Sequence, residues 1–351
     1  MGIRKLLWPL SIIYGGILML RNKYFDWGWL PSQRYNLPVI SVGNLTVGGT
    51  GKTPITEYLI RLLNKEHQLA LLSRGYKRKT KGVIISSNHS TADEIGDEPY
   101  QVKHKYPGIT VAVAEKRTEG IERLMVEIDP EIILLDDAFQ HRYVSAGLSI
   151  LIVDYYRPIW KDFPFPAGNL REPRSGKQRA DIIIVNKCPR NLSETERRQM
   201  IKKIKPLPHQ QVFFTYIGYS TPVALKKEVT VTPGKEMDVL ALTGIGYPKP
   251  FFEYLSSCYN KVNTLTFPDH HDFTKKNIDT ITQVFSDTKN EKKAIITTEK
   301  DAVRLKNLPY LSEEIKKLIW YIPIETRFLF NDKEKFDQII TNYVEKDKRN
   351  S

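Results

Sequence analysis

The stretch Val39-Ile-Ser-Val-Gly43-Asn-Leu-Thr46-Val-Gly48-Gly49-Thr50-Gly51-Lys52-Thr53 joins a short apolar run to a glycine-rich turn and a Lys-Thr pair. A strand, a glycine-rich turn and a helix start, in this order, are the context of a phosphate-binding loop. The N–H groups of such a loop surround phosphate oxygens, Lys52 neutralises their charge and the Thr53 hydroxyl ligates Mg²⁺. The strict pattern begins with glycine, where this chain has Thr46. The residues predicted to bind nucleotide are Thr46, Val47, Gly48, Gly49, Thr50, Gly51, Lys52 and Thr53.

An acidic pair follows a second buried-strand pattern. Four apolar residues, 132–135, end directly in Asp136 and Asp137. Such a strand places its terminal carboxylates at the carboxyl edge of a parallel sheet, where a metal–nucleotide complex would sit. Because strands often end in aspartate, the pair alone is a weak indication of a metal site, and it becomes a strong one in combination with the phosphate loop. Thr53, Asp136 and Asp137 are therefore the predicted Mg²⁺ ligands, because ionised carboxylates are hard oxygen donors.

The N-terminus carries mostly apolar residues, Leu6–Leu20, between Arg4-Lys5 and the basic pair Arg21 and Lys23. As a helix this run is about 22 Å long, which is shorter than the roughly 30 Å hydrocarbon core of a bilayer. The flanking basic and aromatic residues are typical of a membrane interface, so we expect a helix that docks on a membrane rather than a simple crossing. A secretory signal peptide and a helix of the globular core are the alternatives.

Apolar runs recur along the chain with helical patterns between them. Short, non-alternating runs predict strands covered on both faces, and intervening helices such as Glu115–Glu127 favour a parallel sheet in a doubly wound α/β domain. The predicted strands are 39–42, 69–72, 110–113, 132–135, 150–153 and 182–185. A second series from Val239 onward predicts a smaller α/β domain. We expect a membrane-docking segment at 1–30, a phosphate-loop core domain at 31–215 and a second α/β domain at 216–351.

The composition is that of an ordinary globular protein. Of 351 residues, 41% are hydrophobic and 26% charged, which excludes wholesale disorder, collagen-like sequence and a polytopic membrane protein. Only Cys188 and Cys258 occur, which excludes a disulfide framework and favours a reducing compartment. The net charge of +13 predicts an anionic partner, and nucleic acid, nucleotide and an acidic lipid surface all qualify.

The two motifs leave the phosphate acceptor open, because the same apparatus serves ATPases, GTPases, small-molecule kinases and motors. Asn186-Lys187-Cys188-Pro189 lacks the acid of the guanine-reading Asn-Lys-x-Asp motif, which favours ATP over GTP. An ATPase acting on nucleic acid and a regulatory NTPase without a lipid substrate are the alternatives. Against the first, no stretch beyond the N-terminus interleaves basic and aromatic residues as a base-stacking platform does.

Six further polar clusters are predicted to be loops that carry function. They are 73–76 (Ser-Arg-Gly-Tyr), 96–99 (Gly-Asp-Glu-Pro), 136–142 (Asp-Asp-Ala-Phe-Gln-His-Arg), 166–173 (Pro-Ala-Gly-Asn-Leu-Arg-Glu-Pro), 267–271 (Phe-Pro-Asp-His-His) and 298–303 (Thr-Glu-Lys-Asp-Ala-Val). In this order and spacing, with the variant phosphate loop and the apolar N-terminus, the chain resembles the tetraacyldisaccharide 4′-kinase family of the lipid A pathway. The resemblance runs to about Val303. Asn169 and Ala138 stand where proline and glycine are common in the family, and neither has a charged role.

The resemblance implies a kinase on the cytoplasmic face of the inner membrane, peripheral or monotopic, working with ATP and Mg²⁺. The implied substrate is a tetraacylated glucosamine disaccharide 1-phosphate, and the product carries a second phosphate at the 4′ position. The implied fold is two α/β domains joined by a hinge, which close over the nucleotide. The expected partners are this lipid and an anionic membrane surface, with no nucleic acid and no obligate protein partner.

The family's functional residues fall on matching positions in this chain. Its catalytic Asp matches Asp97, its partner His matches His270, and its phosphate-loop Lys matches Lys52. The positions assigned to substrate, from the resemblance and from their loops, are Ser73, Arg74, His141, Arg142, Asn169, Arg171, Glu172 and Asp269. A sugar hydroxyl is a poor nucleophile, so a base within hydrogen-bond reach should add roughly 10²–10⁴-fold in rate. We expect Asp97 to be this base and His270 its partner, while the residues alone also allow His270 to take the proton.

Overall fold

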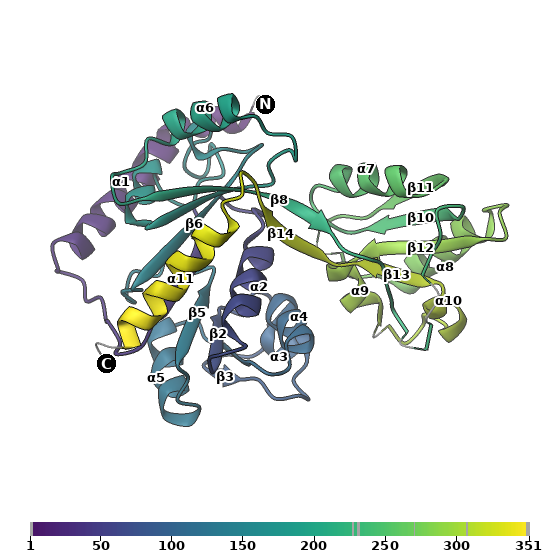
Figure 1. Cartoon of the computed structure of the whole chain (residues 1–351), viewed down its shortest axis with the longest axis horizontal. Coiled ribbons are helices and arrows are strands. Elements are labelled where there is room, and N and C mark those ends of the chain that lie inside the picture. Colours follow the sequence, from purple (N-terminus) through teal and green to yellow (C-terminus); the bar gives the residue numbers. More distant parts are fainter. Residues whose placement is uncertain (1–2, 227, 230–231, 270, 307, 349–351) are drawn as a thin grey trace. The chain divides into compact units, whose positions relative to one another are not determined.

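The computed structural model describes residues 3–226, 228–229, 232–269, 271–306 and 308–348. The chain divides into two compact units (Figure 1): unit 1 comprises Met1–Ile217 and Glu325–Ser351, and unit 2 is the insertion Gly218–Ile324. The predicted boundary after residue 215 lies close to the first crossing. The end of the chain, however, returns to unit 1 instead of remaining in a second domain that spans 216–351, because a C-terminal strand and helix complete the sheet and core of unit 1.

Unit 1 is built on a nine-stranded sheet of order β14-β8-β7-β6-β1-β5-β2-β4-β3. The strands from β8 to β4 run parallel to their neighbours, and β3 is antiparallel to β4. The strand bounds are β1 (Val39–Asn44), β2 (Leu69–Ser73), β3 (Ile84–Ile85), β4 (Thr110–Val113), β5 (Ile132–Asp136), β6 (Leu148–Asp154), β7 (Ile182–Asn186), β8 (Gln211–Tyr219) and β14 (Ile324–Phe328). All six predicted strands form, and the doubly wound parallel sheet is confirmed.

Helices cover both faces of this sheet, as the uninterrupted apolar strands require. One face packs against α2 (Lys52–Leu63), α4 (Asp97–Lys105) and α11 (Lys333–Lys348). The other face packs against α5 (Arg117–Glu127) and α6 (Glu194–Ile204). In Figure 1, α11 crosses the sheet beside α2, and the Tyr58 hydroxyl of α2 donates a hydrogen bond to Asp337 of α11 at 2.5 Å. The short helix α3 (Ala92–Ile95) precedes α4.

The strand order makes β1 a topological switch point of the sheet. Later strands of the chain continue the sheet on both sides of β1, with β5 on one side and β6 on the other. In open α/β sheets, ligands bind outside the carboxyl ends of the strands at such a switch point. The register pairs Val42 with Asp136, which brings the acidic pair to the strand that carries the phosphate loop.

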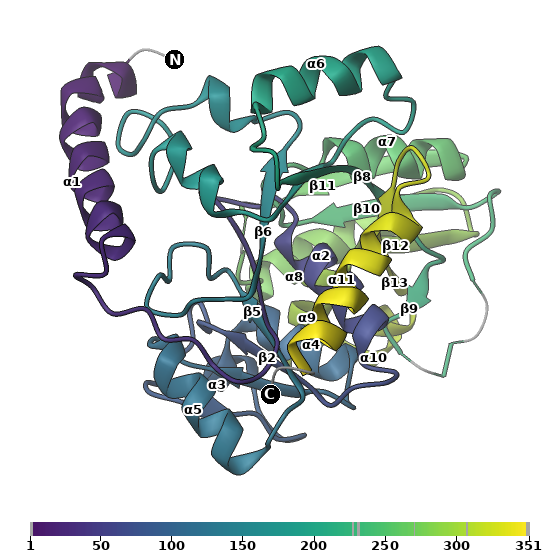
Figure 2. The same ribbon diagram turned by 60° about the vertical axis from the view of Figure 1, so that its left-hand side comes forward.

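The N-terminal helix α1 (Trp8–Asp26) follows a 3₁₀ turn (Ile3–Leu7) and lies at the margin of unit 1 (Figure 2). It packs on the loop around 164–173, where the Ser11 hydroxyl accepts the Ala167 N–H at 2.8 Å. Exposed fractions of 49–62% are found at Trp8, Leu10, Ile12, Ile13, Ile17, Met19 and Leu20. This exposure contradicts the alternative of a helix in the globular core. Among the described residues, no helix has the length and apolar character needed to cross a membrane.

Unit 2 contains a five-stranded sheet of order β11-β10-β12-β13-β9, parallel except for β9, which is antiparallel to β13. Its strands are β9 (Val223–Ala224), β10 (Asp238–Thr243), β11 (Lys261–Thr266), β12 (Lys293–Thr298) and β13 (Ile319–Ile322), and its helices are α7 (Lys249–Cys258), α8 (Lys275–Ser286), α9 (Glu299–Lys306) and α10 (Glu313–Lys317). Helices α8 and α9 pack on one face and α7 on the other, which gives the unit its own core. The predicted smaller α/β domain is thus present.

Candidate functional site

The phosphate loop connects β1 to α2 at the carboxyl edge of the large sheet. Gly48 and Gly51 have φ angles of +90° and +87°, a conformation that side chains rarely adopt, which explains glycine at both positions. The Val47 N–H donates to the Asn169 carbonyl at 2.8 Å and so ties the loop to the 164–173 segment. Gly51 is the N-cap of α2, and the first-turn N–H groups of a helix have no partner within it. The strand, loop and helix start therefore form the predicted anion-binding context.

Lys52, Asp137 and Arg171 form a charged cluster beside this loop. Lys52 Nζ lies 3.5 Å from Asp137 Oδ1, and Arg171 Nη1 lies 2.7 Å from the same oxygen. Burial alone would raise the pKa of Asp137, but the charges of Lys52 and Arg171 outweigh it and hold that pKa below its ordinary value. Asp137 is therefore ionised at neutral pH and holds two cations at the mouth of the phosphate loop.

Asp136 lies deeper than Asp137. It is 6% exposed, and the Thr56 hydroxyl donates to its Oδ1 at 3.3 Å. Burial, and then the negative charges of Glu98 and Asp137, raise the pKa of Asp136. A small cavity beside it is lined by Thr53, Thr56, Leu71, Ser73, Glu98, Pro99, Val102 and Asp136. Glu98 thus joins the acidic group, although the sequence reasoning selected only its neighbour from the Gly-Asp-Glu-Pro cluster.

The predicted Mg²⁺ ligands come together only in part. Thr53 and Asp136 line the same cavity, whereas Asp137 is engaged by two cations. Within the described parts of the chain, no three His, Cys, Asp or Glu side chains are grouped as a ready-made metal site. Nucleotide enzymes usually hold Mg²⁺ with one or two carboxylates, substrate phosphates and water. The Asp136 carboxyl group, whose pKa is raised by burial and by the neighbouring acids Glu98 and Asp137, and the Thr53 hydroxyl offer oxygen ligands that fit such a cation.

Asp97 is the first residue of α4 and follows Gly96, whose φ is +89°. Asp and Asn often cap helices, but here Gly96 occupies the N-cap position, so Asp97 is not the capping residue of α4. A Cβ at Gly96 would lie 2.8 Å from the Tyr76 carbonyl, which shows how closely the two turns approach. The structure therefore brings the 73–76 and 96–99 clusters together, next to the cavity at Asp136.

The residue expected to partner Asp97, His270, lies outside the described residues. Its neighbours belong to unit 2. Asp269 has a 45% exposed side chain, and its Oδ1 lies 4.0 Å from Lys300 Nζ. His271 Nε2 lies 2.9 Å from Asn277 Oδ1, which gives this second histidine a structural contact.

Two of the predicted substrate residues, Arg74 and His141, interact electrostatically with each other near the acidic pair. Burial, followed by the charges of Arg117 and Arg74, lowers the pKa of His141 to about 4, so this imidazole is neutral at pH 7. Arg117 is 2% exposed and donates to the Asp136 carbonyl at 3.4 Å. Arg74 is exposed. It is therefore the member of this group best placed to receive an anionic ligand from solvent.

Arg142 and Asn169 are occupied by contacts with the N-terminal segment. Arg142 donates to the Asn22 carbonyl at 2.6 Å and to Asp26 Oδ1 at 2.8 Å, both in α1. Asn169 Oδ1 accepts a hydrogen bond from Arg4 at 3.2 Å. These contacts favour a role in anchoring α1 over direct contact with substrate.

Glu172, another predicted substrate residue, is 3% exposed and has several internal partners. Its carboxylate accepts hydrogen bonds from Arg179 at 2.7 and 2.9 Å, from Gln140 at 3.0 Å and from Asn22 at 3.1 Å. These donors come from a 3₁₀ helix (Arg174–Arg179), from the loop after β5 and from α1. The geometry therefore favours a structural role for Glu172, which holds these three segments together by hydrogen bonds.

Asp154 and its two cations were missed by the sequence reasoning. Asp154 ends β6 as Asp136 ends β5, so the same pattern of an apolar strand followed by an acid marks both. Its Oδ2 pairs with Lys187 at 3.0 Å and with Arg157 at 3.2 Å. Both cations also contact the Gly49 carbonyl of the phosphate loop. The loop is thus supported by charged groups at the ends of β6 and β7.

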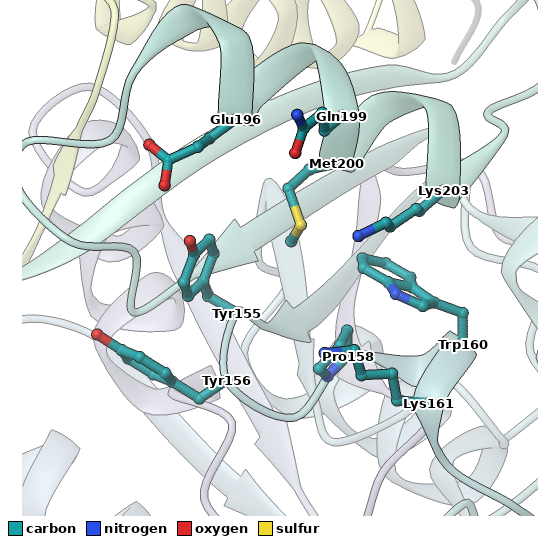
Figure 3. A pocket seen from close by; sticks show the side chains of 9 residues that line it. All are labelled: Tyr155, Tyr156, Pro158, Trp160, Lys161, Glu196, Gln199, Met200 and Lys203. Atoms are coloured by element: carbon teal, nitrogen blue, oxygen red, sulfur yellow. The ribbon is translucent and has the colours of Figure 1, made fainter.

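A larger cavity of about 280 Å³ lies between α6 and the segment after β6 (Figure 3). Its lining residues are Tyr155, Tyr156, Pro158, Trp160, Lys161, Glu196, Gln199, Met200 and Lys203. None of the predicted site residues belongs to this set. The cavity is therefore distinct from the group formed by the phosphate loop and the acidic pair.

The chain matches the family model described as Tetraacyldisaccharide-1-P 4′-kinase over residues 3–345. It is 46% identical to the Tetraacyldisaccharide 4′-kinase of Bacteroides thetaiotaomicron, over 99% of this chain and 95% of that protein. It is 47% identical to the protein of the same name from Flavobacterium psychrophilum, over 98% and 97% of the two chains. In structure it is similar to LpxK from Aquifex aeolicus in complex with ATP, with a TM-score of 0.75 and 31% identity, over 97% of this chain and 99% of that one.

Proposed function

The chain belongs to the tetraacyldisaccharide 4′-kinase family, and from this premise we propose which of its residues perform the reaction. As a member it is a kinase that uses ATP to phosphorylate the 4′-hydroxyl of a tetraacylated glucosamine disaccharide 1-phosphate, giving the 1,4′-bisphosphate precursor of lipid A. The resemblance inferred from the motifs is thereby confirmed. The alternatives of a nucleic-acid-stimulated or regulatory NTPase have no support in these relationships.

The main observation behind the proposal is that Lys52, at the start of α2, and Arg171 both form ion pairs with one carboxylate, that of Asp137. We assign the phosphates of ATP to residues 46–53, where loop N–H groups and the helix start favour an anion. Lys52 and Arg171 then stabilise the charge that spreads over the transferring phosphoryl group. Asp137 keeps both cations oriented before the substrate arrives, which reduces the reorganisation needed for reaction.

Mg²⁺ is proposed to be held by Thr53, Asp136 and Asp137, with Glu98 beside them. When bound, the ion supplies positive charge that neutralises the phosphate oxygens. Burial and neighbouring acids raise the pKa of Asp136. A nearby cation favours the ionised form of such a carboxyl group, so binding of the ion and ionisation of Asp136 support each other. The Thr53 hydroxyl contributes a neutral oxygen from the first turn of α2.

The acceptor hydroxyl needs a base, and we propose Asp97 for that role with His270 as its partner. An Asp–His pair fixes the imidazole tautomer and shares the proton that leaves the hydroxyl. Asp97 follows Gly96 and precedes Glu98 in the first turn of α4, and Glu98 lines the cavity beside Asp136. The pairing with His270 is proposed on chemical grounds and is tested by kinetics.

We propose that α1 docks unit 1 on the cytoplasmic face of the inner membrane. Each CH₂ group withdrawn from a bilayer costs about 0.8 kcal/mol, so a substrate with four acyl chains stays in the membrane and the enzyme must approach it. The exposed apolar side chains of α1 offer the contact, and basic residues such as Arg21 and Lys23 add about 1 kcal/mol each near an anionic surface. An anionic membrane surface would also be an electrostatic partner for part of the protein's net charge of +13.

Transfer of label from γ-labelled ATP to the disaccharide 1-phosphate lipid, with Mg²⁺ and in detergent micelles, tests the proposal. We expect labelled lipid from the wild type and from Lys65→Ala, a variant of an exposed lysine just beyond the other end of α2. Lys52→Ala should lower kcat by about 10²–10³-fold, because it removes a preorganised cation from the transferring group. Absence of labelled lipid, with ATP turnover stimulated by DNA or RNA, would contradict the assignment.

A further inference from the structure

The Asn186 side chain at the end of β7 has no role in the reaction described so far. It is fully buried and makes four hydrogen bonds. Its Oδ1 accepts from the Lys187 N–H at 2.8 Å and from the Thr215 hydroxyl at 3.0 Å. Its Nδ2 donates to the carbonyls of Thr50 at 3.1 Å and Gly51 at 3.4 Å. Because both ends of the amide are used, it has one orientation and is not free to read a nucleobase.

These contacts fix the direction of two peptide units in the phosphate loop. In a trans peptide, the C=O of one residue and the N–H of the next point in opposite directions. Asn186 holds the carbonyls of Thr50 and Gly51 toward β7, so the N–H groups of Gly51 and Lys52 point to the other side. N–H groups at the end of such a loop and the start of its helix are those that surround a bound phosphate.

We propose that Asn186 is a positioning residue for the nucleotide phosphates, which holds peptide units 50–51 and 51–52 with their N–H groups aimed at the anion. The fit is close: a Cβ at Gly51 would lie 2.2 Å from Asn186 Nδ2, and the Gly51 φ is +87°. At the end of β1, which β6 separates from β7, Asn44 Nδ2 donates to the Thr50 hydroxyl at 2.6 Å. Two buried asparagines therefore hold one short stretch of loop.

A second contact fixes the residue before this stretch. Lys187 Nζ and Arg157 Nη2 both donate to the Gly49 carbonyl, the latter at 3.3 Å. Both are paired with Asp154, which is 3% exposed and holds them in place. Three successive carbonyls, at residues 49–51, are thus engaged from the ends of β6 and β7. A loop ordered in this way before binding loses less conformational freedom when the phosphates arrive.

The test is direct binding of MgADP to the whole protein without lipid, measured by isothermal titration calorimetry, with thermal unfolding recorded for each variant. Asn186→Ala removes two hydrogen bonds to the loop and should weaken binding by about 10-fold or more. Thr215→Val leaves Asn186 in place but removes one of the two donors that set its orientation, and should weaken binding several-fold. Thr215→Ser keeps the hydroxyl and should bind as the wild type does. In turnover, KM for ATP should rise while KM for the lipid stays constant.

The proposal rests on residues 46–53 being the phosphate site, so Lys52→Ala is measured in parallel. The positioning role is overturned if folded Asn186→Ala and Thr215→Val bind MgADP with wild-type affinity while Lys52→Ala binds it more weakly. In that case the assignment of the phosphate site is still supported. Wild-type affinity in Lys52→Ala would instead remove the phosphate site itself. If Asn186→Ala does not fold, the Thr215 pair decides: equal affinities of Thr215→Val and Thr215→Ser contradict the proposal, and a selective loss in Thr215→Val supports it.

Discussion

Replacing Glu172 with alanine is expected to destabilise unit 1 rather than to weaken substrate binding. The Glu172 carboxylate is 3% exposed and accepts hydrogen bonds from Arg179, Gln140 and Asn22. Its removal leaves the mostly buried Arg179 guanidinium without a counter-charge, and breaking such a pair costs about 3–5 kcal/mol. For a domain of the size of unit 1, this corresponds to a fall in Tm of roughly 6–20 °C.

Thermal and urea unfolding followed by circular dichroism measure this loss, with Glu172→Gln as the matched control. Glutamine keeps the shape and one acceptor oxygen, so it should lose less stability than alanine and remain folded at 25 °C. In the folded Glu172→Gln protein, KM for the lipid should stay within about twofold of the wild-type value, because Glu172 is assigned no substrate contact. A wild-type Tm in Glu172→Ala, together with a large rise in lipid KM, would refute the structural role and return Glu172 to the substrate site.

Three further predictions concern the base, the membrane and pH. Asp97→Ala and His270→Ala should each lower kcat by about 10²–10⁴-fold with little change in KM for ATP, since both are assigned to the acceptor; an equal loss of ATP binding would place them elsewhere. Serine at both Ile13 and Ile17, which are 60% and 62% exposed, should reduce flotation with anionic vesicles at constant Tm, and unchanged flotation would move the docking surface away from α1. The His141 pKa is about 4 in the folded protein against 6.5 as the ordinary value, so the unfolded chain binds the proton more tightly and the free energy of unfolding should fall as pH drops from about 6.5 toward 4. Urea titrations of His141→Gln should show a smaller fall over that range, and an identical pH dependence would show that His141 is not responsible.

The centre of unit 1 could be predicted because its signals are local. The strand before the phosphate loop, the loop itself and the strand that ends in Asp136 each fall within about fifteen residues. Parallel pairing then follows from the alternation of strands and helices. The pairing of Val42 with Asp136 explains why two motifs far apart in sequence meet at one sheet edge.

The outer part of the sheet could not be predicted in the same way. Strand β8 was not among the predicted strands, although its residues are mostly apolar and aromatic, because the domain boundary predicted after residue 215 falls inside it. Its neighbours Phe213 and Phe214 are buried on opposite faces of the sheet. Helix α11 shows an amphipathic pattern, yet nothing in its residues indicates that it packs on unit 1 rather than on the unit that precedes it. That choice depends on packing between segments far apart in the chain.

The site shows a similar division. The approach of Lys52 to Asp137 could be predicted because the motifs of both residues specify a position on the fold. Arg142 and Glu172 were selected as charged residues in functional loops, and sequence does not reveal that a charged loop residue has found a buried partner inside the protein. Asn186 was read only as part of a nucleobase motif, whereas its burial and its loop contacts are visible only in three dimensions.

The insertion of unit 2 between β8 and β14 has a consequence for synthesis of the protein. A nascent chain that has emerged as far as Ile217 contains the phosphate loop and most of the large sheet, but not the helix that covers one face of it. Phe336, Ile340 and Val344 of α11 are fully buried against that face and are translated only after all of unit 2. Unit 2 can therefore fold first, even though its residues come later than most of unit 1. Until α11 has been translated, this apolar face of the nascent chain lacks the helix that covers it, and exposed apolar surface of this kind promotes aggregation.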